Sequence, residues 1–334
     1  MSNRKKPNMT RGERLCRSLL IAAMCVASLW GIWHLLVVKP VPTEDIPARP
    51  TPTPISAGGG PNASTDASLA EGPYTRKADF YTFLLVGMDR GGGNTDSLML
   101  VSYDVAQQKV AVASIARDTR VDVERKLKKI NAAYAMHDGI EGLKEEVSMT
   151  FGVPIDYYFR VNLRGFIRLV DAVGGIDFEV PCYMNYDDPE QDLSIHYSKG
   201  MQHLSGQQAM EVCRFRQNNG GGGYGDEGRQ NTQRGVLTEV AKKVLSHPEK
   251  LNDYVAIAQE NLDTDMSLSN MAWFATKALS FDTANLSTMS MPCEWINPYM
   301  YLDPAATLEL VNEYLNPSTT PRTANQLDII TRER

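Results

Sequence analysis

The longest hydrophobic run of the chain lies near its amino terminus. Residues 18–38 contain no Asp, Glu, Lys or Arg, and His34 is the one side chain among them that titrates near neutral pH. A helix of this length extends about 30 Å, which matches the hydrocarbon thickness of a bilayer. A cleaved signal peptide would have a shorter apolar core and small residues at its cleavage site. A buried core helix rarely follows a basic leader. The pattern therefore predicts a transmembrane helix over residues 18–38.

The residues before this run predict its orientation. Residues 1–17 carry Arg and Lys at six positions and a single acidic residue, Glu13. Because basic residues stay on the cytoplasmic side, we expect a single-pass protein of the cell membrane with a cytoplasmic amino terminus and an extracellular domain. The formal net charge is -6, and the basic cluster lies beside the apolar run rather than on a folded domain. This arrangement argues against a nucleic-acid partner.

Residues 39–78 form a segment rich in Pro, Gly, Ser and Thr. Such a composition buries too little apolar area to offset the entropy lost when a chain becomes ordered. Repeated prolines also keep a chain extended. We therefore expect a linker between the membrane helix and a folded domain that begins near Asp79.

Apolar runs and helical patterns alternate after Asp79. Nearly continuous apolar runs are typical of strands that are covered on both faces, and the helical segments end at Gly or Pro signals. The alternation predicts one α/β domain over residues 79–316, a three-layer α-β-α sandwich with a central mixed sheet, followed by a loose polar tail over residues 317–334. The predicted strands are 80–86, 98–103, 110–115, 157–161, 176–180 and 286–291, and the predicted helices are 140–151, 163–173, 205–213, 229–245, 267–279 and 304–315.

The five cysteines match neither a metal site nor a disulfide scaffold. Cys16 and Cys25 lie in or beside the apolar run, which leaves Cys182, Cys213 and Cys293 for the outer domain. Three thiols cannot all pair with one another, and no C-x-x-C element is present. One disulfide is compatible with an oxidising exterior, but we expect buried free thiols.

The first candidate loop follows the first predicted strand. Asp89 and Asp96 lie on either side of a glycine run there, at a strand end where open α/β sheets bind ligands. Two carboxylates joined by a flexible turn suit Mg²⁺, which takes oxygen ligands. Asp and Gly also favour turns for purely structural reasons, so this loop alone supports both interpretations.

The second candidate loop follows the strand predicted over residues 110–115 and contains Arg117, Asp118 and Arg120. Taken by themselves, these residues would form an ordinary surface ion pair. Their place at the same edge of the sheet as the first loop favours a shared site instead.

The third candidate segment contains arginines separated by a glycine-rich stretch. Arg214 and Arg216 alternate on an extended segment, and Arg229 and Gln233 lie one turn apart on a predicted helix, close to Asp226. Several guanidinium groups without matching carboxylates are costly unless they bind an anion, and Arg suits bidentate phosphate recognition. The pattern indicates a phosphate-rich ligand.

Several common catalytic motifs are excluded. A formal G-x-G-x-x-G at Gly220, Gly222 and Gly225 arises from a glycine run and follows no predicted strand, so it does not indicate a dinucleotide site. The chain has no Walker A lysine, G-x-S-x-G elbow or H-E-x-x-H helix. P-loop, serine-hydrolase and zinc-protease functions therefore have no support.

Taken together, these segments resemble the LytR-CpsA-Psr family, the bacterial cell-wall ligases that attach teichoic acids, capsules or related glycopolymers to peptidoglycan. The resemblance runs in order from about Phe80 to Val244. Known members have a cytoplasmic amino terminus, one membrane helix and an extracellular catalytic domain. The resemblance rests on residues 84–89, 95–97, 114–119, 129–134, 169–175, 204–209, 214–216 and 225–229.

The resemblance implies roles for the candidate residues. Asp89 and Asp96 would bind Mg²⁺ against a pyrophosphate. Where the family usually has a third basic residue after the Gly-Arg pair, this chain has Thr232, and Arg234 is available to compensate. Ala116 stands where proline is common. The residues expected to hold the phosphate groups are Arg117, Arg214, Arg216, Arg229 and Gln233, with Arg120 as a further candidate beside Asp118.

The implied activity is transfer of a glycopolymer from a polyprenyl-pyrophosphate carrier to a hydroxyl of peptidoglycan, with Asp118 or Asp226 accepting the proton. Two alternatives stay open: hydrolysis of the lipid pyrophosphate at the same site, and a non-catalytic membrane-anchored regulator or anionic-glycan binding protein. The lipid would need an apolar tunnel. The apolar face of residues 140–151 is a candidate wall, although ordinary core packing explains that face more simply.

Overall fold

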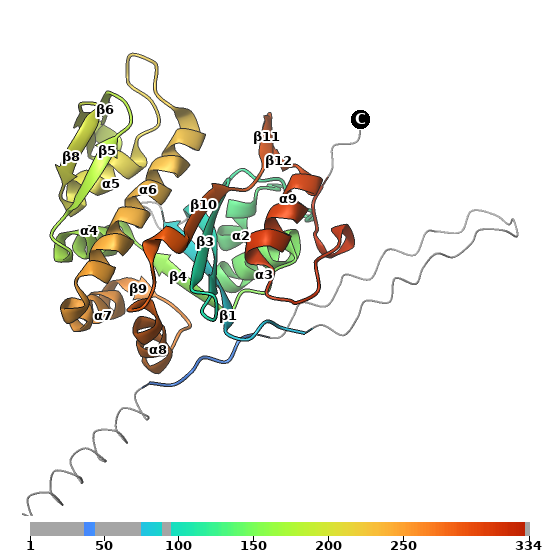
Figure 1. The fold of residues 1–334 in the computed structure, drawn as a ribbon. Coiled ribbons are helices and arrows are strands. Elements are labelled where there is room, and N and C mark those ends of the chain that lie inside the picture. The colour runs from blue at the N-terminus through green and yellow to red at the C-terminus, as the bar shows by residue number, and fades with distance from the viewer. Residues whose placement is uncertain (1–36, 44–74, 89–94, 331–334) are drawn as a thin grey trace, which may run out of the picture. The chain divides into compact units, whose positions relative to one another are not determined.

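The computed structural model describes residues 37–43, 75–88 and 95–330 (Figure 1). Two compact units are distinguished, and each is described by itself. The smaller unit joins residues 37–41 to residues 266–277, which form most of helix α8 (Leu268–Ala278). The backbone N–H of Val38 donates to the carbonyl of Ser269 at 3.2 Å, and the Asn270 side chain donates to the Val38 carbonyl at 3.0 Å. The larger unit contains the rest of the described chain.

A six-stranded mixed sheet forms the centre of the larger unit, in the order β10-β3-β2-β1-β4-β9. β1, β2 and β3 form an antiparallel meander. β4 pairs in parallel with β1, and β10 pairs in parallel with β3. The strands of this sheet are β1 (Phe80–Met88), β2 (Thr95–Asp104), β3 (Lys109–Ile115), β4 (Tyr157–Val161), β9 (Leu262–Asp263) and β10 (Leu286–Ser290).

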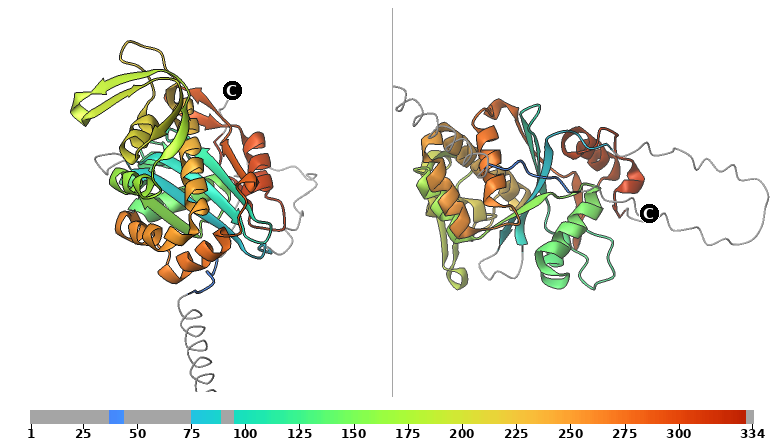
Figure 2. Two further views of the ribbon diagram at one scale, coloured as in Figure 1. Left: turned by 60° about the vertical axis from the view of Figure 1, so that its left-hand side comes forward. Right: turned by 90° about the horizontal axis from the view of Figure 1, so that it is seen from below.

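Helices cover both faces of the sheet, as the views in Figures 1 and 2 agree. One face is covered by α2 and α3 and by α9 with the π-helical turn Val311–Leu315, and the other by α4 to α7. The α/β fold with a central mixed sheet is thus as the sequence predicts. The helices of these layers are α2 (Ala133–Met136), α3 (Gly139–Phe151), α4 (Leu163–Ala172), α5 (Gly206–Arg214), α6 (Gly225–Ser246), α7 (Leu251–Asn261) and α9 (Pro304–Leu310).

The even-numbered positions of β1 belong to the hydrophobic core that includes α3. Leu84 and Val86 share one buried cluster with Leu143, Val147 and Phe151, because alternate side chains of a strand point to the same face. The apolar face of α3 is therefore ordinary core, and the suggestion that it lines a lipid tunnel is wrong. The odd-numbered positions of β1 face the layer of α4, α5 and α6.

Three two-stranded ribbons lie outside the central sheet. The sequence predicts only one of their six strands, β5. The other strands have four or five residues each, and in several of them polar residues interrupt the apolar ones. In β7, for example, Leu193, Ile195 and Tyr197 are buried while Ser194 and His196 are exposed. The ribbons are β5 (Ile176–Val180) with β8 (Gly200–Leu204), β6 (Met184–Asp188) with β7 (Leu193–Tyr197), and β11 (Cys293–Ile296) with β12 (Tyr299–Leu302).

The tail after α9 is ordered, contrary to the prediction of a loose segment over residues 317–334. Ser318 is 2% exposed, and the Asp328 N–H donates to the Met149 carbonyl at 3.1 Å. Leu327 and Ile329 also pack against the core that contains α3. The segment is polar in composition, but its backbone finds partners on the domain and two apolar side chains hold it there. Residues 331–334 lie outside the described residues.

Most of the predicted membrane helix, residues 18–36, also lies outside the described residues. Among the residues that are described, no helix is both long and apolar enough to cross a bilayer. The predicted linker is described only at its two ends. At those ends, Thr43 donates its N–H to Asp156 Oδ1 at 2.7 Å, and Arg76 pairs with Asp156 Oδ2 and donates to the Thr43 carbonyl.

Candidate active site

The candidate site lies where β1 and β2 separate. Gly87 pairs with Ser97 and Met88 pairs with Thr95, so the pairing skips Asp96 at a β-bulge or similar irregularity. Asp96 is the second residue of β2 and lies at the rim of the sheet. Asp89, its proposed partner, follows β1 directly and lies outside the described residues.

Strand register brings Arg117 to Asp96. Leu98 of β2 pairs with Ile115 of β3 in the antiparallel meander, so the residue two positions before Leu98 lies opposite the residue two positions after Ile115. Arg117 Nη1 donates to Asp96 Oδ1 at 2.9 Å. The sequence-based expectation that these two loops share one edge of the sheet is confirmed.

Two further arginines reach the same carboxylate region from α6 and from the segment before it. Arg216 contacts Asp96 Oδ1 at 3.9 Å and Asp226 Oδ1 at 3.5 Å. Arg229 pairs with Asp226 Oδ1 at 2.7 Å and donates to the Asp96 carbonyl at 3.2 Å. We call these five residues, Asp96, Arg117, Arg216, Asp226 and Arg229, the arginine cluster.

The arginine cluster carries excess positive charge in a partly buried place. Arg229 is 3% exposed, and its Nε has no hydrogen-bond partner among the described residues. Burial lowers the pKa of Arg216, and the neighbouring Arg229 and Arg117 lower it further. Three guanidinium groups of the cluster face its two carboxylates, and the neighbouring Asp118, which contacts Arg117 at 3.9 Å, is paired with Lys129 at 2.9 Å. An anion that accepts several N–H bonds would relieve the repulsion between the guanidinium groups. The arrangement is that of an oxyanion or phosphate site.

An apolar pocket of about 190 Å³ opens beside the arginine cluster, between the sheet and the layer of α4, α5 and α6. Its polar rim includes Asp96, Arg214, Arg229 and Gln233. Arg214 is held there by Gln191, to which it donates at 2.5 Å, and the Gln233 amide donates to the Cys213 carbonyl at 3.2 Å. The apolar wall consists mainly of Leu85, Met99, Leu163, Phe166, Met210 and Leu237.

A second pocket, of about 530 Å³, meets the arginine cluster from the side of β10 and the β11–β12 ribbon. We call it the hairpin pocket. Its polar wall is formed by Arg117, Asp118, Arg216, Asp226, Glu227 and Gln230, and its remaining wall by Ala116, the segment from Ser290 to Cys293, Trp295 and Met300. The arginine cluster therefore contributes residues to both pockets.

Not every predicted residue joins the cluster. Arg120 lies with its guanidinium carbon 5.4 Å from the centre of the Tyr299 ring, and its backbone N–H donates to the Met300 carbonyl. The structure does not bring Arg120 into the arginine cluster, since its guanidinium lies against Tyr299 and its backbone pairs with the β11–β12 ribbon. Asp118 does line the hairpin pocket, where Lys129 pairs with it at 2.9 Å.

The sequence-based prediction did not include two residues that line the pockets. Gln191 and Trp295 carry no local motif, and each reaches its pocket only through a short ribbon or turn that the sequence pattern does not predict.

The three cysteines of the described domain are free thiols, as expected. Cys213 borders the apolar pocket and Cys293 the hairpin pocket. Burial raises the pKa of Cys213 to about 12. Burial, together with Glu227 and Asp226, raises the pKa of Cys293 to about 11. Both groups are therefore neutral near pH 7 and are poor nucleophiles there.

The carboxylate chemistry of the site fits a hard cation in one respect. Asp96 lies at the rim with its side chain partly exposed, and both arginine contacts fall on Oδ1. Mg²⁺ is commonly held by one or two carboxylates together with substrate phosphates, so Asp96 is a suitable donor. No group of three His, Cys, Asp or Glu residues suited to a metal occurs within the described part of the chain.

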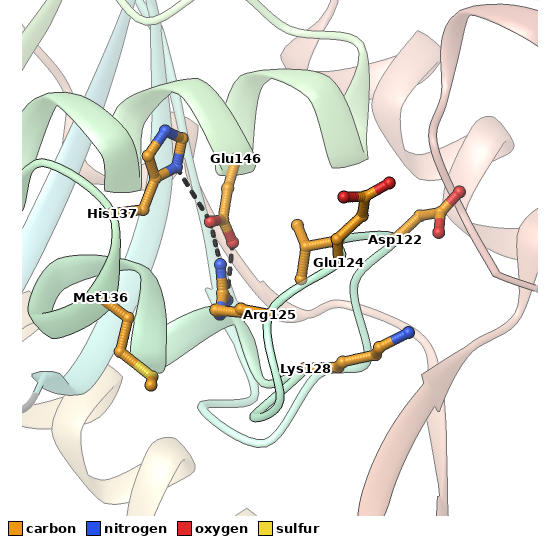
Figure 3. A pocket seen from close by; sticks show the side chains of 8 residues that line it. Asp122, Glu124, Arg125, Lys128, Met136, His137 and Glu146 are labelled. Atoms are coloured by element: carbon orange, nitrogen blue, oxygen red, sulfur yellow. Dashed lines mark hydrogen bonds and ion pairs between the residues drawn. The ribbon is translucent and has the colours of Figure 1, made fainter.

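A third cavity, of about 580 Å³, lies between α3 and the loop that carries Arg125 (Figure 3). Glu146, which is 6% exposed, accepts hydrogen bonds from both terminal nitrogens of Arg125 and lies 3.2 Å from His137 Nδ1. The charges of Arg125 and Glu146 are thus paired with each other, as the dashed lines in Figure 3 show. We conclude that Arg125, Glu146 and His137 hold the loop against α3.

The fold and site together define a class: a three-layer α/β domain with a cationic cluster between an apolar pocket and an open polar pocket. The chain belongs to the LytR-CpsA-Psr family, because the model of the LytR_cpsA_psr family matches residues 60–316.

Curated relatives carry transferase names. The chain is 34% identical over 213 residues to polyisoprenyl-teichoic acid–peptidoglycan teichoic acid transferase TagU of Bacillus mycoides (strain KBAB4), covering 62% of this chain and 67% of that relative. It is 30% identical over 235 residues to the transferase TagV of Bacillus subtilis (strain 168), covering 67% of this chain and 59% of TagV. The alignments thus span about two thirds of the relatives or less.

Solved structures share the fold. The crystal structure of B. subtilis TagV superposes with a TM-score of 0.59 at 27% identity, over 70% of this chain and 95% of that one. The structure of TagT bound to LIIa-WTA has a TM-score of 0.56 at 19% identity, over 71% of this chain and 89% of that one, which shows a common fold.

Proposed function

We propose that this protein transfers a phosphate-linked glycopolymer from a polyprenyl-pyrophosphate carrier to a hydroxyl of peptidoglycan, outside the cell and anchored by residues 18–38. One observation carries the proposal: the arginine cluster lies at the rim of the apolar pocket, so a ligand with a diphosphate next to a hydrocarbon chain matches both. The transferase names of the relatives and the family membership support it.

The arginines would supply most of the binding and charge neutralisation. Arg229 and Arg216 would bind the two phosphates, which would replace the carboxylates that these arginines contact in the structure. Arg214 and Gln233 lie at the mouth of the apolar pocket, where the lipid-side phosphate would sit. Fixed N–H donors of this kind stabilise the charge that develops on a departing phosphate, and positioning provides much of the rate in phosphoryl transfer.

We propose Mg²⁺ as the metal, held by Asp96 together with Asp89 and by the substrate phosphates. A bound Mg²⁺ would supply neutralisation of charge on the phosphate oxygens. Asp96 would then exchange its contact with Arg117 for the cation, and Arg117 would turn to the phosphate. Removal of divalent cations with a chelator should abolish transfer, and addition of Mg²⁺ should restore it.

The base that accepts the hydroxyl proton would be Asp226 or Asp118, both of which line the hairpin pocket. Asp226 pairs with Arg229 and Arg216, whereas Asp118 pairs with Lys129. Exchange of each Asp for Asn keeps the shape and removes the basic oxygen. Asp226 is the stronger candidate because it contacts the two arginines that would hold the phosphates.

The deciding experiment incubates the full chain with a polyprenyl-pyrophosphate glycan labelled in the sugar, Mg²⁺ and peptidoglycan. Transfer predicts label in the peptidoglycan. A pyrophosphatase would release soluble phosphorylated glycan at the same rate with or without the acceptor.

A non-catalytic binding protein would leave the labelled lipid unchanged. In that case there is no turnover to lose, and Asp96→Asn should change lipid binding little. For a transferase, the same variant should retain much of the lipid affinity and lose turnover.

A further inference from the structure

The β11–β12 ribbon presents one face to the hairpin pocket. Cys293 pairs with Leu302, and Trp295 pairs with Met300, so these four side chains share a face of the ribbon. Cys293, Trp295 and Met300 all line the hairpin pocket. The ribbon thus forms one wall of a cavity whose opposite wall is the arginine cluster and the first turn of α6.

Trp295 is the most conspicuous residue on that face. Its side chain is large and apolar, yet the residue is 52% exposed, although it lines a cavity. Because the ring lines a pocket and faces solvent, it offers a flat apolar surface on which a ligand can stack. The ring therefore suits a ligand with a flat apolar face.

The facing wall provides hydrogen-bond acceptors and donors. Asp118, Asp226, Glu227 and Gln230 contribute carboxylate and amide groups to the same cavity. A sugar ring offers C–H groups on its faces, which stack on an aromatic ring, and hydroxyls around its edge, which donate to carboxylates and amides. The combination of Trp295 with these acceptors matches the chemistry of a saccharide.

The two pockets lie on different sides of the arginine cluster. In phosphoryl transfer, this arrangement would separate the attacking group from the leaving group. Attacking and leaving oxygens lie roughly in line on the phosphorus. If the lipid phosphate departs toward the apolar pocket, a hydroxyl that enters from the hairpin pocket reaches the phosphorus from another side, as in-line attack requires. The sugar already attached to the phosphorus then takes an equatorial place, to one side of that line.

We propose that the hairpin pocket binds the acceptor saccharide, with Trp295 stacking on one of its rings. This inference rests on the proposed transferase function and deepens it. In the step, the acceptor hydroxyl oxygen forms a bond to the glycan-side phosphorus, and its proton passes to the carboxylate of Asp226. The bond from that phosphorus to the bridging oxygen breaks, and its electron pair leaves with polyprenyl phosphate.

The test measures transfer kinetics of the full chain with donor and acceptor varied separately. Trp295→Ala should raise the acceptor KM about tenfold and leave the donor KM and kcat within about twofold, because a lost stacking contact of about 1.4 kcal/mol corresponds to a factor of ten. Trp295→Phe should recover most of the affinity. Tyr183→Ala, which removes another exposed aromatic ring outside both pockets, is the matched control and should change nothing.

An unchanged acceptor KM in Trp295→Ala would overturn the assignment while leaving the transferase function intact. If the donor KM rises in the same variant, the donor's own sugar, rather than the acceptor, occupies the hairpin pocket.

A binding measurement separates this inference from the proposed function. A soluble disaccharide repeat of peptidoglycan should change the tryptophan fluorescence of the wild type, and the change should disappear in Trp295→Phe. If the wild type shows that signal without any transfer, the transferase function fails and the saccharide site stands. If transfer occurs and the disaccharide gives no signal dependent on Trp295, the site fails and the function stands.

Discussion

Arg229 is the most buried guanidinium of the arginine cluster, with 4% of its side chain exposed against 28% for Arg117 and 36% for Arg216. A donor that is fixed and shielded from water contributes more to charge stabilisation than an exposed one. We therefore expect Arg229→Gln to lower the transfer rate by about 100-fold or more. The measurement is the initial rate of label transfer to peptidoglycan at saturating donor.

The control for Arg229 is Arg168→Gln on α4. Arg168 pairs with Glu260 at 3.0 Å, and both side chains are more than half exposed, so the pair adds little to stability. This variant should transfer at the wild-type rate. A rate for Arg229→Gln within threefold of the control would remove Arg229 from the phosphate site.

Cys293 allows a test of burial in the hairpin pocket. Its pKa is raised to about 11 from the ordinary 9.0, so at pH 8 about 100-fold less thiolate is present than in the unfolded chain. The higher pKa also makes each thiolate more nucleophilic, which offsets part of that factor. We expect iodoacetamide to label Cys293 about tenfold more slowly in the folded protein than in urea, as measured by peptide mass spectrometry. Equal rates would contradict the burial.

Sequence reasoning predicted the cluster residues well where strand register decides their place. Asp96 and Arg117 follow from two adjacent antiparallel strands, and Arg229 from the first turn of a helix. Arg120, three residues after Arg117, does not join the cluster, because the chain there pairs with the β11–β12 ribbon. The sequence does not predict a role for Trp295, because only its exposure in the pocket distinguishes it, and exposure cannot be read from residue type or spacing.

Helix α5 packs closely on α4 through Gly206. A Cβ at this position would lie 2.1 Å from the carbonyl oxygen of Ile167, which is backbone and cannot move aside. We expect Gly206→Ala to destabilise the domain by about 1–3 kcal/mol, as other overpacked contacts do. Thermal unfolding followed by circular dichroism would measure it.

Gly220→Ala is the companion variant. A Cβ added at Gly220 would have no neighbouring atom within 4 Å, so the methyl group meets open space. This variant should unfold at the wild-type temperature. If Gly206→Ala and Gly220→Ala unfold together, the close approach of α4 and α5 is not a determinant of stability.

Among the elements, the buried ones were the easiest to predict. β1, β2, β3 and β4 contain apolar runs, and the strand predicted over each of them overlaps the observed one. The more polar β10 also overlaps its predicted strand. The β6–β7 and β11–β12 ribbons were not predicted, since their strands are short and their pairing partners, rather than their composition, stabilise them. The helix predicted over residues 205–213 corresponds to α5, whose N-cap Ser205 forms a capping box with Gln208.

At the scale of the whole molecule, the two ends of the Pro-rich segment meet on the same buried carboxylate. Asp156 accepts from Thr43 and from Arg76, and the Thr43 carbonyl accepts from Arg76 at 2.8 Å. Deletion of residues 47–72 leaves these contacts in place and shortens the loop they close, which reduces the entropic cost of closure. We expect the deletion to retain the wild-type unfolding temperature to within a few degrees.

Asp156→Asn tests the same junction from the other side. It leaves Arg76 without its buried counter-charge, and loss of one partner of a buried pair typically costs about 3–5 kcal/mol. This variant should unfold at a clearly lower temperature than the deletion. The opposite order would show that residues 47–72, rather than the junction, stabilise the domain.

The same junction limits how far the catalytic domain can stand from the bilayer. If residues 18–38 cross the membrane, the path from Val38 to Thr43, which is fixed on Asp156, is five residue steps, at most about 18 Å when fully extended. The residues between Thr43 and Arg76 add nothing to that maximum distance, because Thr43 and Arg76 both contact Asp156. The proposed transferase would thus work close to the membrane surface, with the diphosphate and the adjoining part of the hydrocarbon chain in its site and the far end of that chain still in the bilayer.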